Sequence, residues 1–91
     1  MTLRAAIATS RFRRDVKRLK KRGADLTRLM KIVDAIQSIG APPAAARPHL
    51  LLGAWAGHFE CHVAPDWLLI YQVDPAEVRL YRTGTHSDLF G

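Results

Sequence analysis

Residues 58–73, His-Phe-Glu-Cys-His-Val-Ala-Pro-Asp-Trp-Leu-Leu-Ile-Tyr-Gln-Val, show a hydrophobic period of two in their first half. The apolar side chains there are Phe59, Cys61 and Val63, and polar ones alternate with them. This alternation predicts a strand covered on one face by helices and polar on the other. The following Pro65-Asp66 predicts a turn. Residues 68–73 are apolar on both faces, so they are expected to form the central strand of the sheet.

The rest of the second half predicts one more strand. Asp74-Pro75 indicates a turn, and residues 78–83 return as the last strand. Because the connections are this short, neighbouring strands are expected to run antiparallel, as a meander.

The first forty residues predict a short edge strand, residues 3–9, and then two amphipathic helices. Ser10 is a favourable N-cap for the first helix, which has a narrow apolar stripe and ends at Gly23. Asp25 caps the second helix, which ends at Gly40. The apolar face of the second helix is wider and contains Leu26, Leu29, Met30, Val33 and Ile36.

The order of these elements predicts the fold. Residues 22–24 are too few to separate the helices, so an antiparallel helical hairpin is expected. Residues 41–48 contain three prolines and predict an extended connector. The expected fold class is α+β, a small twisted antiparallel sheet with an N-terminal helical hairpin on one face, in the order β-α-α-β-β-β. Residues 1–91 are expected to form a single domain.

The composition excludes several classes of protein. No apolar run approaches the roughly 20 residues of a membrane-spanning helix, and the N-terminus lacks the pattern of a secretory signal. The one cysteine, Cys61, excludes an internal disulfide and any zinc site built on CxxC. These features predict a cytoplasmic protein with no cofactor.

The charge is strongly uneven along the chain. The formal net charge is +6, but residues 1–31 carry eleven basic and two acidic side chains, a net charge of +9. A small domain this basic is expected to bind a polyanion or an acidic protein. The alternative is a basic helix face that is merely solvated.

Five ionisable side chains in the second half are candidates for chemistry: His49, His62, Asp66, Arg82 and His86. His62 is expected on the polar face of its strand. His58 and His62 do not form a metal pair, since four residues of strand separate them by about 13 Å. Cys61 is expected to be a buried apolar residue rather than a nucleophile.

Each candidate also has a structural explanation. Asp66 is placed to cap its own turn, and His86 follows a Thr85/Asp88 pair that resembles a capping box. Trp67 has the character of a core residue. Arg82 shares the parity of side chains that face the helices, so a bulge near Gly84, or an early end of the strand, is needed to turn it to the other face.

Two segments carry a family resemblance. They are residues 49–71, with the pattern G-x-W-x-G-x-x-E-x-H-V-x-x-D-W-L-L-I-Y from Gly53 onward, and residues 81–91, with the pattern R-T-G-T-H-x-x-L-F. The chain resembles the YafQ branch of the RelE/ParE toxin superfamily from end to end. This resemblance implies a RelE-like fold and a toxin of a type II toxin–antitoxin pair that cleaves mRNA on the translating ribosome. The site residues that it implies are His49, His62, Asp66, Trp67, Arg82, His86 and Phe90.

These residue types suit RNA cleavage. The 2′-OH of RNA is the nucleophile, so cleavage needs a base, an acid and a cation at the phosphate, and no metal. Histidine serves as base or acid, and arginine binds phosphate through a bidentate fork. We expect His86 near the leaving group and His49 or Asp66 near the 2′-OH. Trp67 or Phe90 is expected to stack on a base.

The expected partners follow from charge and from the resemblance. Lys20, Lys21 and Arg22 are predicted to contact ribosomal RNA phosphates. An acidic antitoxin is expected to cover the basic helices or the His62/Arg82 face, and to supply the only contact with DNA. Alternative hypotheses are a ParE-like toxin that acts on DNA gyrase, a ribosome-independent RNase, and a non-catalytic RNA-binding module.

Overall fold

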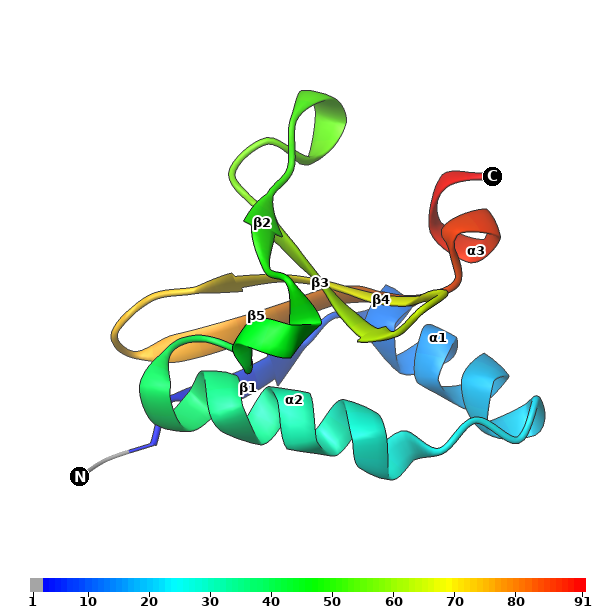
Figure 1. The fold of residues 1–91 in the computed structure, drawn as a ribbon, viewed down its shortest axis with the longest axis horizontal. Coiled ribbons are helices and arrows are strands. Elements are labelled where there is room, and N and C mark those ends of the chain that lie inside the picture. Colours follow the sequence, from blue (N-terminus) through cyan, green and yellow to red (C-terminus); the bar gives the residue numbers. More distant parts are fainter. Residues whose placement is uncertain (1–2) are drawn as a thin grey trace.

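A computed structural model gives the structure of residues 3–91, in which a five-stranded sheet has both long helices on one face (Figure 1). The strand order is β1-β5-β4-β3-β2. The strands are β1 (Ala5–Ala8), β2 (His49–Leu50), β3 (Phe59–Ala64), β4 (Trp67–Val73) and β5 (Glu77–Gly84). The helices are α1 (Ser10–Lys21), α2 (Leu26–Ile39) and α3 (His86–Phe90), with short 3-10 turns η1 (Ala44–Ala46) and η2 (Gly53–Trp55).

The core lies between the sheet and the two helices. Leu69 and Tyr71 of β4 pack there against Leu19 of α1 and Ile36 of α2, and all four are buried. Cys61 is fully buried on the same face, as its parity predicts, and burial raises the pKa of its thiol to about 12. The expected fold class is confirmed, and β4 is the central strand.

Both edges of the sheet differ from the prediction. At one edge, β2 adds a fifth strand to the expected four, and residues 41–48, expected to be extended, contain the turn η1. The other edge differs in strand direction. Strands β3, β4 and β5 form the expected antiparallel meander, but β1 pairs parallel with β5, from Ala5 opposite Glu77 to Ala8 opposite Leu80. Short turns force antiparallel pairing only between strands that they connect. No short turn joins β1 to β5, so the meander does not constrain the direction of β1.

The helix boundaries agree closely with the sequence. Thr9, not Ser10, is the N-cap of α1, and its Oγ1 accepts a hydrogen bond from the Phe12 N–H at 3.0 Å. The same hydroxyl donates to the Tyr81 carbonyl at 2.8 Å, a tertiary contact that explains why the cap lies one residue earlier. Asp25 caps α2 through the Thr27 N–H, as predicted. Glycines with positive φ follow both helices.

The apolar face of α2 is rotated from the prediction. Ile32 is buried, while Met30 is 54% exposed. Met30 borders an apolar cleft of about 240 Å³ between α1 and α2, because the two helices diverge over the sheet and do not cover it completely. No helix in residues 3–91 is long and apolar enough to cross a membrane.

A bulge in β5 resolves the parity of Arg82. Leu80 pairs with Tyr71 and Arg82 pairs with Ile70, which leaves Tyr81 as the extra residue. Directly paired residues share a face, so the backbone at Arg82 directs its side chain toward the face of Ile70, but the guanidinium reaches Asp15 of α1 and is buried there. The required bulge therefore exists, but it is at Tyr81 and not near Gly84.

Candidate functional site

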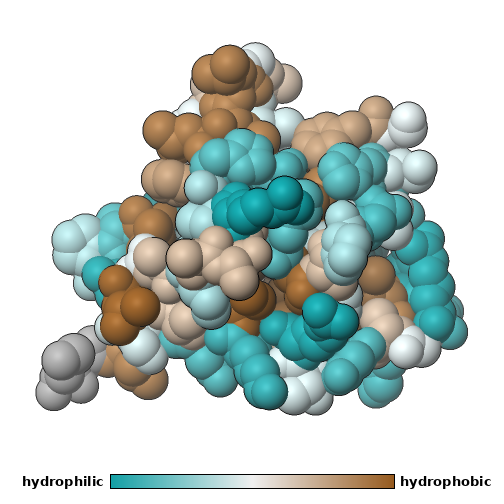
Figure 2. All heavy atoms as spheres, viewed as in Figure 1, coloured by the Kyte–Doolittle hydropathy of each residue, from teal (hydrophilic) through white to brown (hydrophobic). Residues whose placement is uncertain are grey.

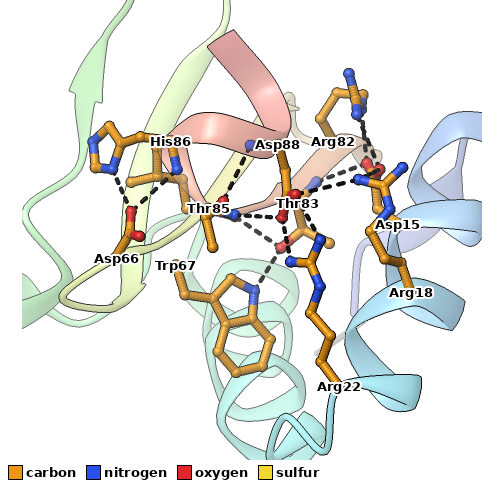
Figure 3. A network of polar contacts seen from close by, with 11 residues as sticks. Asp15, Arg18, Arg22, Asp66, Trp67, Arg82, Thr83, Thr85, His86 and Asp88 are labelled. Carbon is orange, nitrogen blue, oxygen red and sulfur yellow. Dashed lines mark hydrogen bonds and ion pairs between the residues drawn. The ribbon is translucent and has the colours of Figure 1, made fainter. Parts of the chain in front are cut away.

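The centre of the candidate site is an Asp66–His86 pair at one end of the sheet. Asp66 lies in the turn between β3 and β4, and His86 is the first residue of α3, separated from β5 by Thr85 alone. One carboxylate oxygen, Oδ1, accepts the His86 backbone N–H at 3.1 Å and lies 2.6 Å from His86 Nδ1 (Figure 3). Because a carboxylate only accepts, this contact places the proton on Nδ1 and leaves Nε2 facing away from Asp66. The hydrogen bonds from His86 lower the pKa of Asp66.

His62 completes this group from β3. Its ring centroid lies 6.4 Å from that of His86. Its Nδ1 is buried, and within residues 3–91 it has no hydrogen-bond partner. The structure therefore brings His62, Asp66 and His86 together, as the sequence predicted, and leaves one imidazole nitrogen unused.

The Asp88 carboxylate fixes the position of α3. Thr85 and Asp88 form the capping box that the sequence indicated. The Asp88 carboxylate also accepts hydrogen bonds from Nη1 and Nη2 of Arg22, at 2.8 and 2.9 Å. These bonds link α3 to the end of α1. Chiefly through Arg22, the pKa of Asp88 lies well below its ordinary value. Gly84 makes this possible, because a Cβ at its φ of +153° would lie 2.8 Å from Asp88 Oδ2.

Arg82 is held by an acidic partner that sequence reasoning missed. Its Nε and Nη2 donate to the Asp15 carboxylate at 2.7 and 3.0 Å, and the Thr83 N–H donates to the same carboxylate at 3.1 Å. Both side chains are buried, and the hydrogen bond to Asp15 raises the pKa of Arg82. A signal was present in the sequence, since Asp15 is the single acidic residue of α1. Figure 3 shows this pair apart from the Asp66–His86 pair.

His49 is not part of the hydrogen-bonded group around His86. It pairs with Glu60 across β2 and β3, with Nε2 of His49 3.4 Å from Oε1 of Glu60. Glu60 is buried and was not singled out by the sequence analysis. Only the register of a two-residue strand brings it opposite His49, and no pattern in the sequence fixes that register.

Trp67 and Phe90 were both predicted to contact substrate, and they have different environments. Trp67 is buried in the core with Leu69 and Tyr71, and its Nε1–H donates to Thr83 Oγ1 at 2.9 Å. Its indole face is therefore covered by protein, which favours the core explanation over stacking. Phe90 is 50% exposed at the end of α3 and is free to stack.

The three basic residues predicted to bind ribosomal RNA differ in whether they form an ion pair. Lys20 and Lys21 are exposed, and neither has an ion-pair partner in residues 3–91. Arg22 is committed to Asp88, and that pairing raises the pKa of Arg22. Among residues 3–91, no three His, Cys, Asp or Glu side chains are grouped closely enough to hold a metal ion together.

The fold is that of a small α+β protein, and the comparisons give its class, the toxins of bacterial toxin–antitoxin systems. Residues 4–91 match the family described as the bacterial toxin YafQ of a type II toxin–antitoxin system. The chain belongs to the YafQ toxin family.

Relatives support this assignment over nearly the whole chain. The mRNA interferase toxin YafQ of Escherichia coli K12 is 38% identical over 84 residues, 91% of each chain. The toxin in the E. coli DinJ–YafQ toxin–antitoxin complex superposes with a TM-score of 0.87 at 37% identity, covering 98% of this chain and 99% of that one. A metal-bound toxin from Helicobacter pylori superposes with a TM-score of 0.84 at 35% identity, covering 99% and 100%.

Proposed function

We propose that this chain is the toxin of a type II toxin–antitoxin pair and cleaves mRNA on the translating ribosome. The observation that carries the proposal is the Asp66–His86 pair beside His62, with Nε2 of His86 directed away from its carboxylate partner. The name of the E. coli relatives, mRNA interferase toxin, supports the choice of substrate. Translating ribosomes would place the protein in the cytoplasm.

The reaction follows from the chemistry of the 2′-OH. A base takes the 2′-OH proton, the 2′ oxygen forms a bond to phosphorus, and the bond from phosphorus to the 5′ oxygen breaks. The products are a 2′,3′-cyclic phosphate and a 5′-OH. We assign His86 as the acid that protonates the leaving 5′ oxygen, because Asp66 orients its ring and leaves Nε2 directed away from the carboxylate.

The base and the cation are assigned from the contacts of the remaining candidates. Asp66 is occupied by His86, which leaves His49 and His62 for the 2′-OH. Arg82 was the candidate cation, but Asp15 holds two of its nitrogens and balances its charge. We therefore assign Arg82 as a residue that positions the end of β5. Phe90 is the remaining candidate for stacking on a base.

The proposal also includes a partner. A basic, toxic nuclease needs a neutralising protein, and the E. coli relative is found in a complex with DinJ. We expect an acidic antitoxin that covers the basic helices or the His62 face, with DNA contacted only through the antitoxin. Co-expression of the neighbouring antitoxin is expected to abolish the growth arrest that the toxin alone causes.

The test is primer extension on an mRNA translated in a reconstituted system. The parent toxin is expected to cut, and His86→Gln is expected to lose at least about 10²-fold in rate, the lower range for a positioned general acid. His58→Gln is the matched control, since His58 packs between Trp55 and Tyr81 outside the site. A cut that survives 2′-O-methylation of the cleaved nucleotide would contradict the mechanism.

Two further arms separate the alternatives. Cleavage of naked RNA at the same rate would favour a ribosome-independent RNase, and inhibition of DNA supercoiling by gyrase without RNA cleavage would favour the ParE-like hypothesis. Because the H. pylori relative is metal-bound, the toxin is treated with EDTA and returned to the assay. Full activity after this treatment is expected.

A further inference from the structure

A cleft beside the candidate site is lined by cations and by no carboxylate. It has a volume of about 590 Å³ and lies between α2, η1 and the end of β3. The basic and titratable side chains in its lining are Arg28, Lys31, Arg47 and His62. Within residues 3–91, the first three of these have no carboxylate within ion-pair distance. Positive charge is therefore concentrated here without local compensation (Figure 2 shows hydrophilic side chains around this hollow, above α2).

The cleft exists because β3 loses its neighbour at this point. β2 pairs with β3 only through His49 and Leu50, so no strand of residues 3–91 covers β3 from Cys61 to Ala64 on that edge. The chain turns away at Arg47, which has φ of +50° and is the sole non-glycine residue with positive φ in residues 3–91. This conformation is unfavourable for a residue with a Cβ. It holds Arg47 at the border of the cleft.

His62 joins the cleft to the Asp66–His86 pair. Its side chain lines the cleft, its Nδ1 is buried without a partner in residues 3–91, and its ring lies 6.4 Å from that of His86. Apolar side chains complete the lining, among them Ile32 and Val63. A ligand in the cleft would thus meet cations, an apolar surface and the His62 side chain, and would adjoin the group assigned to cleavage.

We propose that this cleft binds the phosphate and sugar of an RNA nucleotide that flanks the cleaved bond. The inference rests on the proposed function in taking RNA as the substrate. The volume is that of a pocket for a ligand of nucleotide size, arginine forks match phosphate oxygens, and the apolar lining suits a ribose or base. The residues assigned to this subsite are Arg28, Lys31 and Arg47, with His62 shared between the subsite and the cleavage site.

The test measures binding without the ribosome and without cleavage. The probe is a short single-stranded RNA, 2′-O-methylated at every sugar, followed by fluorescence anisotropy at several salt concentrations. The triple variant Arg28→Gln, Lys31→Gln, Arg47→Gln is expected to raise Kd at least tenfold. The log–log salt slope is expected to fall by about 0.7 for each phosphate that the variant no longer neutralises. In the parent, RNA should shift the NMR signals of the His62 ring, and in the triple variant it should not.

A charge-matched control separates a site from general attraction. The triple variant Arg11→Gln, Arg13→Gln, Lys17→Gln removes the same charge from exposed positions of α1. Equal loss of RNA affinity in both triples, or parent-like binding by the cleft triple, would overturn the inference. The inference would also be overturned if the cleft triple variant lost antitoxin binding but kept the RNA affinity of the parent. A parent toxin that binds RNA in the cleft but cuts no mRNA would instead contradict the proposed function.

Discussion

Asp66 contacts His86 both at its backbone and at its ring, so one carboxylate sets the position and the tautomer of the assigned acid. Because these hydrogen bonds lower the pKa of Asp66 below its ordinary 3.8, the carboxylate stays charged at every pH above about 4. Asp66→Asn keeps the shape and removes the charge. We expect kcat to fall by about 10²-fold with KM little changed. The measurement is single-turnover cleavage between pH 5 and 8.

The sign of the pH effect gives a second readout for the same residue. A group with a depressed pKa is charged above that pKa, so protonation of Asp66 does not limit the parent within this range. An acid limb of the parent that disappears in Asp66→Asn would contradict the assignment, since it would mean that Asp66 itself titrates there.

At the scale of elements, the buried Arg82–Asp15 pair joins β5 to α1. Removing one partner of a buried ion pair leaves the other uncompensated and costs about 3–5 kcal/mol. We therefore expect Asp15→Asn to lower the free energy of unfolding by about that amount in urea denaturation. Asp34→Asn, an exposed acid on α2, is the control and should change it by less than about 0.5 kcal/mol. A small effect of Asp15→Asn would mean that Arg82 finds another partner.

Asp88 makes the attachment of α3 sensitive to acid. The Arg22 guanidinium and the Thr85 cap depress its pKa, so its contribution is complete above the ordinary pKa of 3.8 and is lost as pH falls below it. At pH 6 we expect Asp88→Asn to cost about 1–2 kcal/mol, the value of a helix cap. Between pH 5 and pH 2 the parent should lose stability more steeply than the variant. Parallel curves in acid unfolding would contradict this account.

Local patterns predicted the elements, and tertiary contacts decided what the patterns left open. The alternation through Cys61 and Val63 placed His62 on the open face, because one strand has only two faces. The same reasoning left Arg82 uncertain, since a bulge at Tyr81 depends on pairing with β4. Asp15 and Glu60 were missed for a related reason. Their partners, Arg82 and His49, meet them only after the sheet and helices are assembled.

For the whole molecule, the net charge of +9 in residues 1–31 is not all available to RNA. Arg22 is bound to Asp88, whereas Lys20 and Lys21 have no ion pair in residues 3–91. We therefore expect Lys20→Gln with Lys21→Gln to weaken ribosome binding and to reduce the log–log salt slope by roughly 0.7–0.9 for each phosphate left without its lysine. Arg22→Gln should change that slope less and instead loosen α3. The measurement is ribosome co-sedimentation over a salt series, with thermal unfolding of each variant beside it.

If Arg22→Gln lowers the slope as much as one lysine does, the Arg22–Asp88 pair opens on the ribosome. If the lysine variant binds like the parent at every salt concentration, the basic helix is a solvated face and not a ribosome contact.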